Sequence, residues 1–135
     1  MKTNLVSFMN KKKHIFIVDD EEEISSLLSY LIKNDFDVET TLLKNGEEAI
    51  FQLEQQNPDM IICDYTMPIK NGLDVLRRNH QLKNCPFIML TGDFPDKYPE
   101  LASIKNLNQH NEVLTKPFSP VAILDLIEKI LEIKR

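Results

Sequence analysis

Five polar side chains stand directly after short apolar runs of this chain, and their types could do chemistry together. Asp19 and Asp20 follow HIFIV, Asp64 follows MIIC, Thr91 follows PFIML, and Lys116 follows EVLT. Carboxylates gathered in one place repel one another, and a hard divalent cation or a nearby ammonium neutralises them at low cost. The first question is therefore whether the fold brings these residues together.

The chemistry that such a cluster would support is the handling of a phosphoryl group. Mg²⁺ with oxygen ligands and retained waters fits the carboxylates, and Lys116 supplies the ammonium. A hydroxyl, a lysine and a metal grouped around a carboxylate make a site for a tetrahedral dianion. Asp64 is the natural nucleophile of this group, and Gly92 after Thr91 would let a ligand approach closely.

Strand patterns and helix patterns alternate along the chain. Strands are predicted at 14–18, 36–41, 60–63, 86–90 and 112–115, most of them apolar on both faces. Helices are predicted from 21 to 32, from 46 to about 57, from 72 to 82, weakly around 100–107, and from an N-cap at Ser119 and Pro120 to 133. Alternation with right-handed crossovers gives a parallel sheet between helices, and ligands gather beyond the carboxyl ends of its strands.

Helical spacing also predicts which helix faces are buried. The first helix should bury one stripe, namely Ile24, Leu27, Leu28, Leu31 and Ile32, and the third should bury Leu73, Leu76 and Leu82. The last helix is apolar over more than one face, through Ile123, Leu124, Leu126, Ile127, Ile130, Leu131 and Ile133. A single buried face does not need all of these apolar residues, so the others predict a surface that binds a partner.

Length and composition place the chain among single globular domains. It has 135 residues, of which 42% are hydrophobic and 27% charged, and its net charge of −5 disfavours nucleic acid as a direct partner. No apolar stretch approaches the ~20 residues of a membrane span, and no secretory signal is present, so the cytoplasm is expected. Cys63 and Cys85 lie in apolar runs and are interpreted as core residues.

Four motifs in order carry a family resemblance. The segments VDD at 18–20, CDYTMP at 63–68 with NG at 71–72, MLTG at 89–92 and LTKPF at 114–118 resemble the receiver domain of bacterial response regulators over about residues 12–133. The resemblance implies an α/β fold, a doubly wound five-stranded parallel sheet in the flavodoxin-like order 2-1-3-4-5 with five helices. It also implies a cis peptide between Lys116 and Pro117.

The resemblance further assigns roles to the site residues. Asp64 would accept a phosphoryl group from a phosphohistidine, and Thr91 and Lys116 would contact the phosphoryl oxygens. The Mg²⁺ ligands would be Asp19, Asp20, Asp64 and Thr66, of which Asp19 acts through water and Thr66 through its backbone carbonyl. Thr66 and Asp93 would flank the path of the hydrolytic water.

The chain departs from the family pattern in the part that couples phosphorylation to a partner. Val113 stands where family members usually carry a switching aromatic residue, and a polar stretch at 106–111 replaces the usual Gly-Ala turn. A β-branched side chain has few χ1 states to exchange. Conformational change is therefore expected in the Thr91 loop and in 93–110, with the last helix as the docking surface.

The resulting prediction is a stand-alone receiver domain at 12–135 behind an N-terminal extension at 1–11, without an output domain. It would take its phosphoryl group from a histidine kinase or histidine phosphotransfer protein and signal to a downstream protein, with a homodimer through the last helix as an option. Its only catalysis would be its own phosphorylation and dephosphorylation.

Two other functions stay open. One is a small phosphatase of the haloacid dehalogenase type, which would need an Asp where Thr66 stands. The other is a pseudo-receiver that binds partners without phosphorylation. A dinucleotide-binding domain is disfavoured, because the first strand is followed by acids and no glycine.

Overall fold

The computed structural model of the protein describes residues 11–92 and 99–135. Its five strands are β1 (Lys13–Val18), β2 (Val38–Leu43), β3 (Met60–Asp64), β4 (Phe87–Thr91) and β5 (Glu112–Thr115). They form one sheet in the order β2-β1-β3-β4-β5, and every pairing is parallel. The doubly wound α/β fold is thereby confirmed, as is the order that the family resemblance implied.

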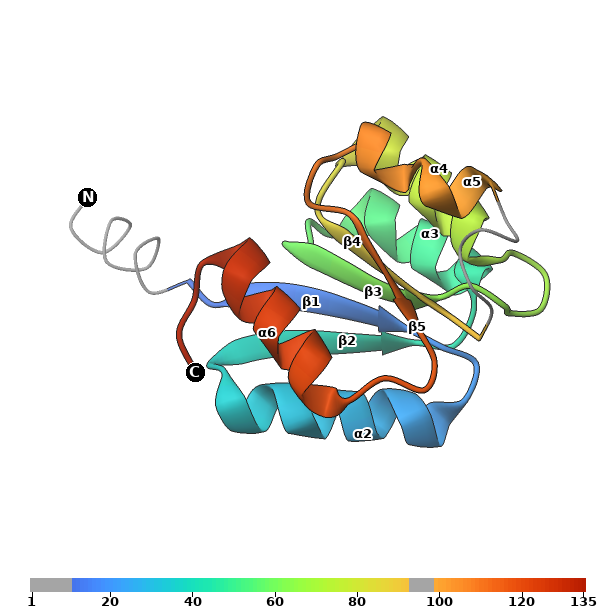
Figure 1. The fold of residues 1–135 in the computed structure, drawn as a ribbon. Helices are drawn as coiled ribbons and strands as arrows, with labels where there is room; N and C mark the ends of the chain where they lie inside the picture. Colours follow the sequence, from blue (N-terminus) through green and yellow to red (C-terminus); the bar gives the residue numbers. More distant parts are fainter. Residues whose placement is uncertain (1–10, 93–98) are drawn as a thin grey trace, which may run out of the picture.

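Helices cover both faces of this sheet (Figure 1). They are α2 (Glu22–Asp35), α3 (Gly46–Gln55), α4 (Gly72–Leu82), α5 (Pro99–Ala102) and α6 (Pro120–Leu131), with the 3-10 helix η2 (Ile104–Asn106) after α5. One core cluster joins α2 and α6 to the sheet, and the other joins α3, α4, α5 and η2 to the opposite face. Among the described residues, no helix is long and apolar enough to cross a membrane.

The central strands are apolar on both faces because both faces are covered. In β1, Phe16 belongs to the core cluster under α3 and α4, whereas Ile15 and Ile17 belong to the cluster under α2 and α6. All residues of β3 and β4 are buried. The two cysteines lie in these cores as predicted, Cys63 fully buried and Cys85 half-buried, and neither forms a disulfide.

Several predicted segments differ from the structure in extent, most of them by one to three residues at an end. The second strand begins at Val38, because buried Phe36 ends α2 by donating its backbone N–H to the carbonyl of Ile32. The weak helix around 100–107 is divided into α5 and η2. Leu101 and Ile104 attach this segment to the core.

Two expectations about the buried faces of helices were wrong. Leu27 is 57% exposed, because the buried stripe of α2 is narrower than predicted and centres on Leu28 and Ile32. Leu82 is 38% exposed at the end of α4, where buried Asn79 takes the core position and bonds the backbone of Cys85. Ser119 is the N-cap residue of α6 and Pro120 begins the helix, both as predicted, although the serine side chain makes no capping hydrogen bond.

Most of the apolar residues of α6 pack against the chain's own core. Four of its apolar residues are buried, namely Ile123, Leu124, Ile127 and Leu131. Leu126, Ile130 and Ile133 are partly buried against the same core cluster. The structure therefore leaves α6 with less free apolar surface than the sequence pattern indicated.

The polar stretch at 106–111 forms a hydrogen-bonded anchor between β4 and β5. The buried side chain of Asn111 accepts from the N–H of Phe87 and donates to the carbonyl of Ile104. The side chain of Asn108 donates to the carbonyl of Asn84. These bonds attach the end of the α5 and η2 segment to the amino end of β4. That end of the sheet is opposite the end at which the predicted site lies.

Candidate functional site

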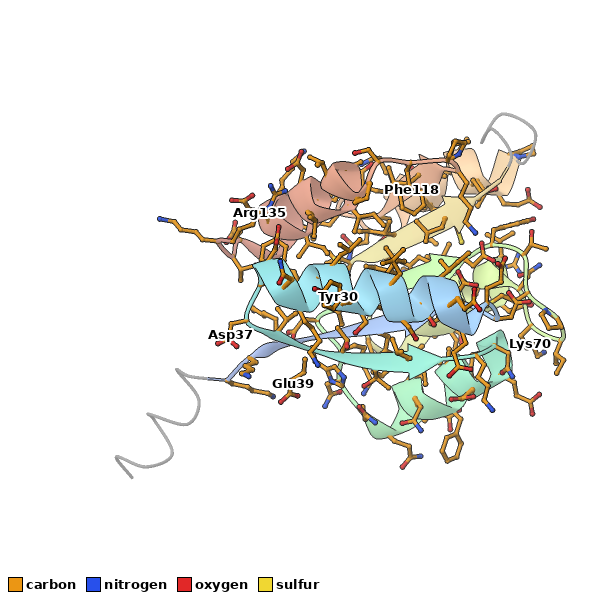
Figure 2. All side chains as sticks on the ribbon, turned by 90° about the horizontal axis from the view of Figure 1, so that it is seen from below. Tyr30, Asp37, Glu39, Lys70, Phe118 and Arg135 are labelled. Atoms are coloured by element: carbon orange, nitrogen blue, oxygen red, sulfur yellow. The ribbon has the colours of Figure 1, made fainter. Side chains whose placement is uncertain are left out.

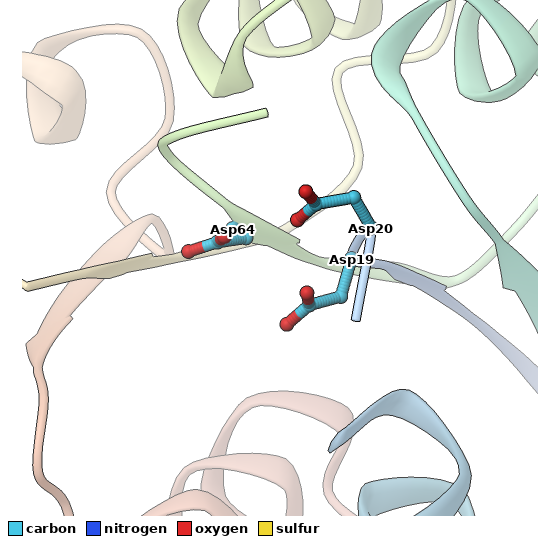
Figure 3. A group of neighbouring side chains, drawn as sticks. All are labelled: Asp19, Asp20 and Asp64. Atoms are coloured by element: carbon cyan, nitrogen blue, oxygen red, sulfur yellow. The ribbon is translucent and has the colours of Figure 1, made fainter. Parts of the chain in front are cut away.

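Three carboxylates meet where two neighbouring strands end (Figure 3). Asp64 is the last residue of β3, and Asp19 and Asp20 follow β1 directly. The two strands pair with Val18 beside Cys63, so the residues that follow each of them come together. One oxygen from each carboxylate lies within 4.8 Å of the others. This confirms that the fold gathers the predicted acids.

Burial makes this cluster costly without a cation. Asp19 is 2% exposed and Asp64 is 6% exposed, whereas Asp20 is open to solvent. Desolvation raises the pKa of Asp19 to about 6, although the backbone N–H of Glu21 bonds its Oδ1 and opposes this change. Asp19 Oδ2 is buried and has no hydrogen-bond partner in the described part of the chain. An unpartnered oxygen on a carboxylate that belongs to such an acidic cluster fits a divalent cation.

Lys116 is the ammonium predicted for the site. Its Nζ donates to Asp64 Oδ1 at 3.0 Å, across 52 positions of sequence. Burial raises the pKa of the Asp64 carboxyl, and the bond to Lys116 opposes that rise. The backbone N–H of Lys116 also donates to the carbonyl of Thr91, so the ends of β4 and β5 are tied together. The peptide bond between Lys116 and Pro117 is cis, as the family resemblance implied.

The other predicted residues that the structure describes, Thr91 and Thr66, lie at the same end of the sheet. Thr91 ends β4 and is buried, with Thr115 of β5 as its strand partner. Among the described residues, no atom outside Gly92 and its chain neighbours lies within 4 Å of a Cβ built on Gly92. Thr66 is exposed in the loop after Asp64. Asp93 lies outside the described residues.

Gly72 is a site-forming residue whose role the sequence analysis missed. A Cβ on Gly72 would lie 2.7 Å from the carbonyl oxygen of Asp64 and 2.5 Å from Met89 Sδ. Its N–H donates to the carbonyl of Tyr65, which closes the loop after Asp64. Asn71 caps α4 in a capping box with Asp74. The pair Asn71-Gly72 predicted a helix start, but only the packing shows that glycine lets α4 approach the backbone of Asp64.

The comparisons place the chain in a family. The model of the response regulator receiver domain matches residues 15–128, and the chain belongs to this family. It is 37% identical over 126 residues to the alkaline phosphatase synthesis transcriptional regulatory protein PhoP of Bacillus subtilis, covering 91% of this chain and 49% of that protein. It is also 28% identical to the CAI-1 autoinducer sensor kinase/phosphatase CqsS of Vibrio cholerae, covering 94% of this chain and 19% of that protein.

Solved structures show the same fold. The response regulator TrrA of Thermotoga maritima, solved in complex with Mg²⁺ and a beryllium fluoride, has a TM-score of 0.74 and 28% identity. The match covers 87% of this chain and 98% of TrrA. The chain spans about half the length of the transcriptional regulators that it matches.

Proposed function

We propose that this protein accepts a phosphoryl group on Asp64 from the phosphohistidine of a partner protein. The observation that carries this proposal is the arrangement around Asp64. Its Oδ1 is held at 3.0 Å by Lys116, and Asp19 and Asp20 lie within 4.8 Å. A buried carboxylate with an ammonium and two more acids close to it is suited to receive a dianion together with a cation.

The transfer is an attack by a carboxylate oxygen of Asp64 on phosphorus. A P–O bond forms as the P–N bond breaks, and the imidazole of the donor leaves with the bonding electron pair. Lys116 offers positive charge to the phosphoryl oxygens, and we assign the hydroxyl of Thr91 to the same task. Because these groups are fixed by the strand ends, they need little rearrangement when charge develops.

Mg²⁺ is the metal we propose for the acidic cluster. Its ligands would be Asp19, Asp20, Asp64 and the backbone carbonyl of Thr66, with Asp19 acting through a water. When bound, the ion would neutralise the three carboxylates and the incoming phosphoryl charge. The unpartnered Asp19 Oδ2 supports this assignment, as does the Mg²⁺ complex of the similar TrrA.

The proposed partners are a histidine kinase or histidine phosphotransfer protein and a downstream protein target. A homodimer through α6 stays a prediction, because most apolar residues of that helix pack into the chain's own core. The boundaries 1–11 and 12–135, stand-alone action, a cytoplasmic location and the absence of nucleic-acid contact also stay predictions.

The test is phosphorylation by a small donor. Incubation with phosphoramidate and Mg²⁺, followed by intact mass measurement, should add one phosphoryl group to the wild-type protein and none to Asp64→Asn. No gain in the wild type would favour the pseudo-receiver. Steady release of inorganic phosphate from phosphate monoesters would favour the phosphatase.

A further inference from the structure

The loop between β3 and α4 holds an isoleucine in an unusual state. Ile69 has a φ of 71°, in the left-handed region that β-branched residues avoid for steric reasons. Its side chain is 74% exposed, more than any other large hydrophobic side chain in the described part of the protein. An exposed isoleucine alone is ordinary. The N–H of Lys70 donates to the carbonyl of Pro68 across Ile69, which holds the backbone in this turn. The isoleucine side chain gains nothing from packing in return for the strained φ, so it points to a function outside the chain.

The rest of this loop is firmly attached, so the conformation of its tip is imposed by the fold. Met67 is buried in the core cluster under α3 and α4. The N–H of Gly72 bonds the carbonyl of Tyr65 at 2.8 Å. At the start of α3, a Cβ on Gly46 would lie 2.3 Å from the carbonyl oxygen of Lys70, so the two backbones are in close contact.

The loop leaves the sheet directly after the proposed phosphoacceptor. In Figure 1 it projects beyond the carboxyl ends of the strands, and in Figure 2 its residue Lys70 lies at that end of the molecule. Asp64 is only 6% exposed, so a phosphohistidine must be brought down onto it. A protein that does this has to lie across the loops at this edge, whereas a small phosphodonor does not.

We propose that Ile69 is a recognition contact that packs against an apolar patch beside the phosphohistidine of the donor protein. This inference rests on the proposed function. The fixed loop would present the side chain in its docking position before the donor arrives, so little ordering is needed on binding. Neighbouring Pro68 is also exposed and extends the apolar tip. Ile69 does not touch the reacting atoms, and its effect should fall on donor affinity.

The test uses Ile69→Asn and Ile69→Gly, because both residues tolerate a left-handed backbone. Leu82→Asn is the matched control, since Leu82 is exposed at the far end of α4, about 15 Å along the helix from Gly72. Two probes are compared: phosphoramidate, and the phosphorylated histidine kinase core from the source organism that labels the wild type fastest.

Both Ile69 variants should lower kcat/KM with the kinase core about tenfold, mainly through a higher KM. Labelling by phosphoramidate should stay within about twofold of wild type, and Leu82→Asn should match wild type with both donors. The unfolding midpoint of Ile69→Gly should equal or exceed that of the wild type.

Unchanged kcat/KM with the kinase core would overturn the proposal, as would an equal loss with both donors, which would mean that Ile69 only shapes the site. A wild type that phosphoramidate labels and no kinase core labels would also overturn it. Failure of the proposed function itself is seen separately, as a wild type that accepts a phosphoryl group from neither donor.

Discussion

Asp19→Asn should stabilise the metal-free protein at neutral pH. The pKa of Asp19 is raised from 3.8 to about 6, chiefly by burial, so the folded protein holds this proton more tightly than the unfolded chain. Each pH unit between the two pKa values is worth about 1.4 kcal/mol, so ionising Asp19 destabilises the fold by up to about 3 kcal/mol. The amide removes this charge and can donate to a neighbouring carboxylate.

The raised pKa of Asp19 determines how the stability difference between Asp19→Asn and the wild type depends on pH. The favourable contribution of protonated Asp19 is complete below pH 3.8 and is lost as pH rises through about 6. The variant lacks this titration. Its advantage over the wild type should therefore be below about 1 kcal/mol at pH 4 and should reach up to about 3 kcal/mol at pH 7.5.

Urea unfolding in EDTA at the two pH values measures this difference. Asp37→Asn is the control, because Asp37 is a highly exposed aspartate whose ion pair with Lys12 lies on the surface. That control should change the free energy of unfolding by no more than about 0.5 kcal/mol. Added Mg²⁺ should stabilise the wild type more than Asp19→Asn. The first contrary result is a free energy of unfolding of Asp19→Asn equal to that of the wild type at pH 7.5, and the second is one that exceeds it equally at both pH values. Either result would refute the view that burial destabilises the ionised Asp19 carboxylate when no cation is bound.

Further predictions concern the metal, the packing and the dynamics. Asp20→Ala should weaken Mg²⁺ binding about tenfold or more in calorimetric titration, and equal affinity would contradict the ligand assignment. Gly72→Ala should destabilise the fold by about 1–3 kcal/mol in urea, because its Cβ would meet the Asp64 carbonyl oxygen and Met89 Sδ. Asp93→Ala should lengthen the lifetime of the acyl phosphate if Asp93 orients the hydrolytic water, and a shorter lifetime would reverse that role. Beryllofluoride with Mg²⁺ should change amide hydrogen exchange in residues 99–107, and a change confined to α6 would contradict this.

Much of the site followed from the sequence because strand ends in a parallel sheet share one edge. The acids, Thr91 and Lys116 each follow an apolar run, and such runs are recognisable when both faces of a strand are covered. The family motifs supplied the strand order, which periodicity alone does not contain. The bond between Lys116 and Asp64 then depends on β4 lying between β3 and β5.

Other features depend on packing between distant segments, which a local pattern does not report. Leu27 fits the helical stripe of α2, but the sheet beneath covers a narrower face than the spacing implies. Asn111 looks like an ordinary turn residue until β4 and η2 are placed on either side of its amide. Ile69 has its left-handed φ in a turn closed by the N–H of Lys70 and the carbonyl of Pro68, and the close approach of Gly46 to Lys70 is a further constraint that no local pattern reports.

The central claim is that Asp64 carries the phosphoryl group, and chemical trapping tests it most directly. After incubation with phosphoramidate and Mg²⁺, borohydride reduction converts an aspartyl phosphate into homoserine, which peptide mass mapping locates. We predict homoserine at position 64 alone, and none when Mg²⁺ is replaced by EDTA. Homoserine at Asp19 or Asp20, or a phosphoryl group that resists borohydride and stays on a histidine, would contradict the account.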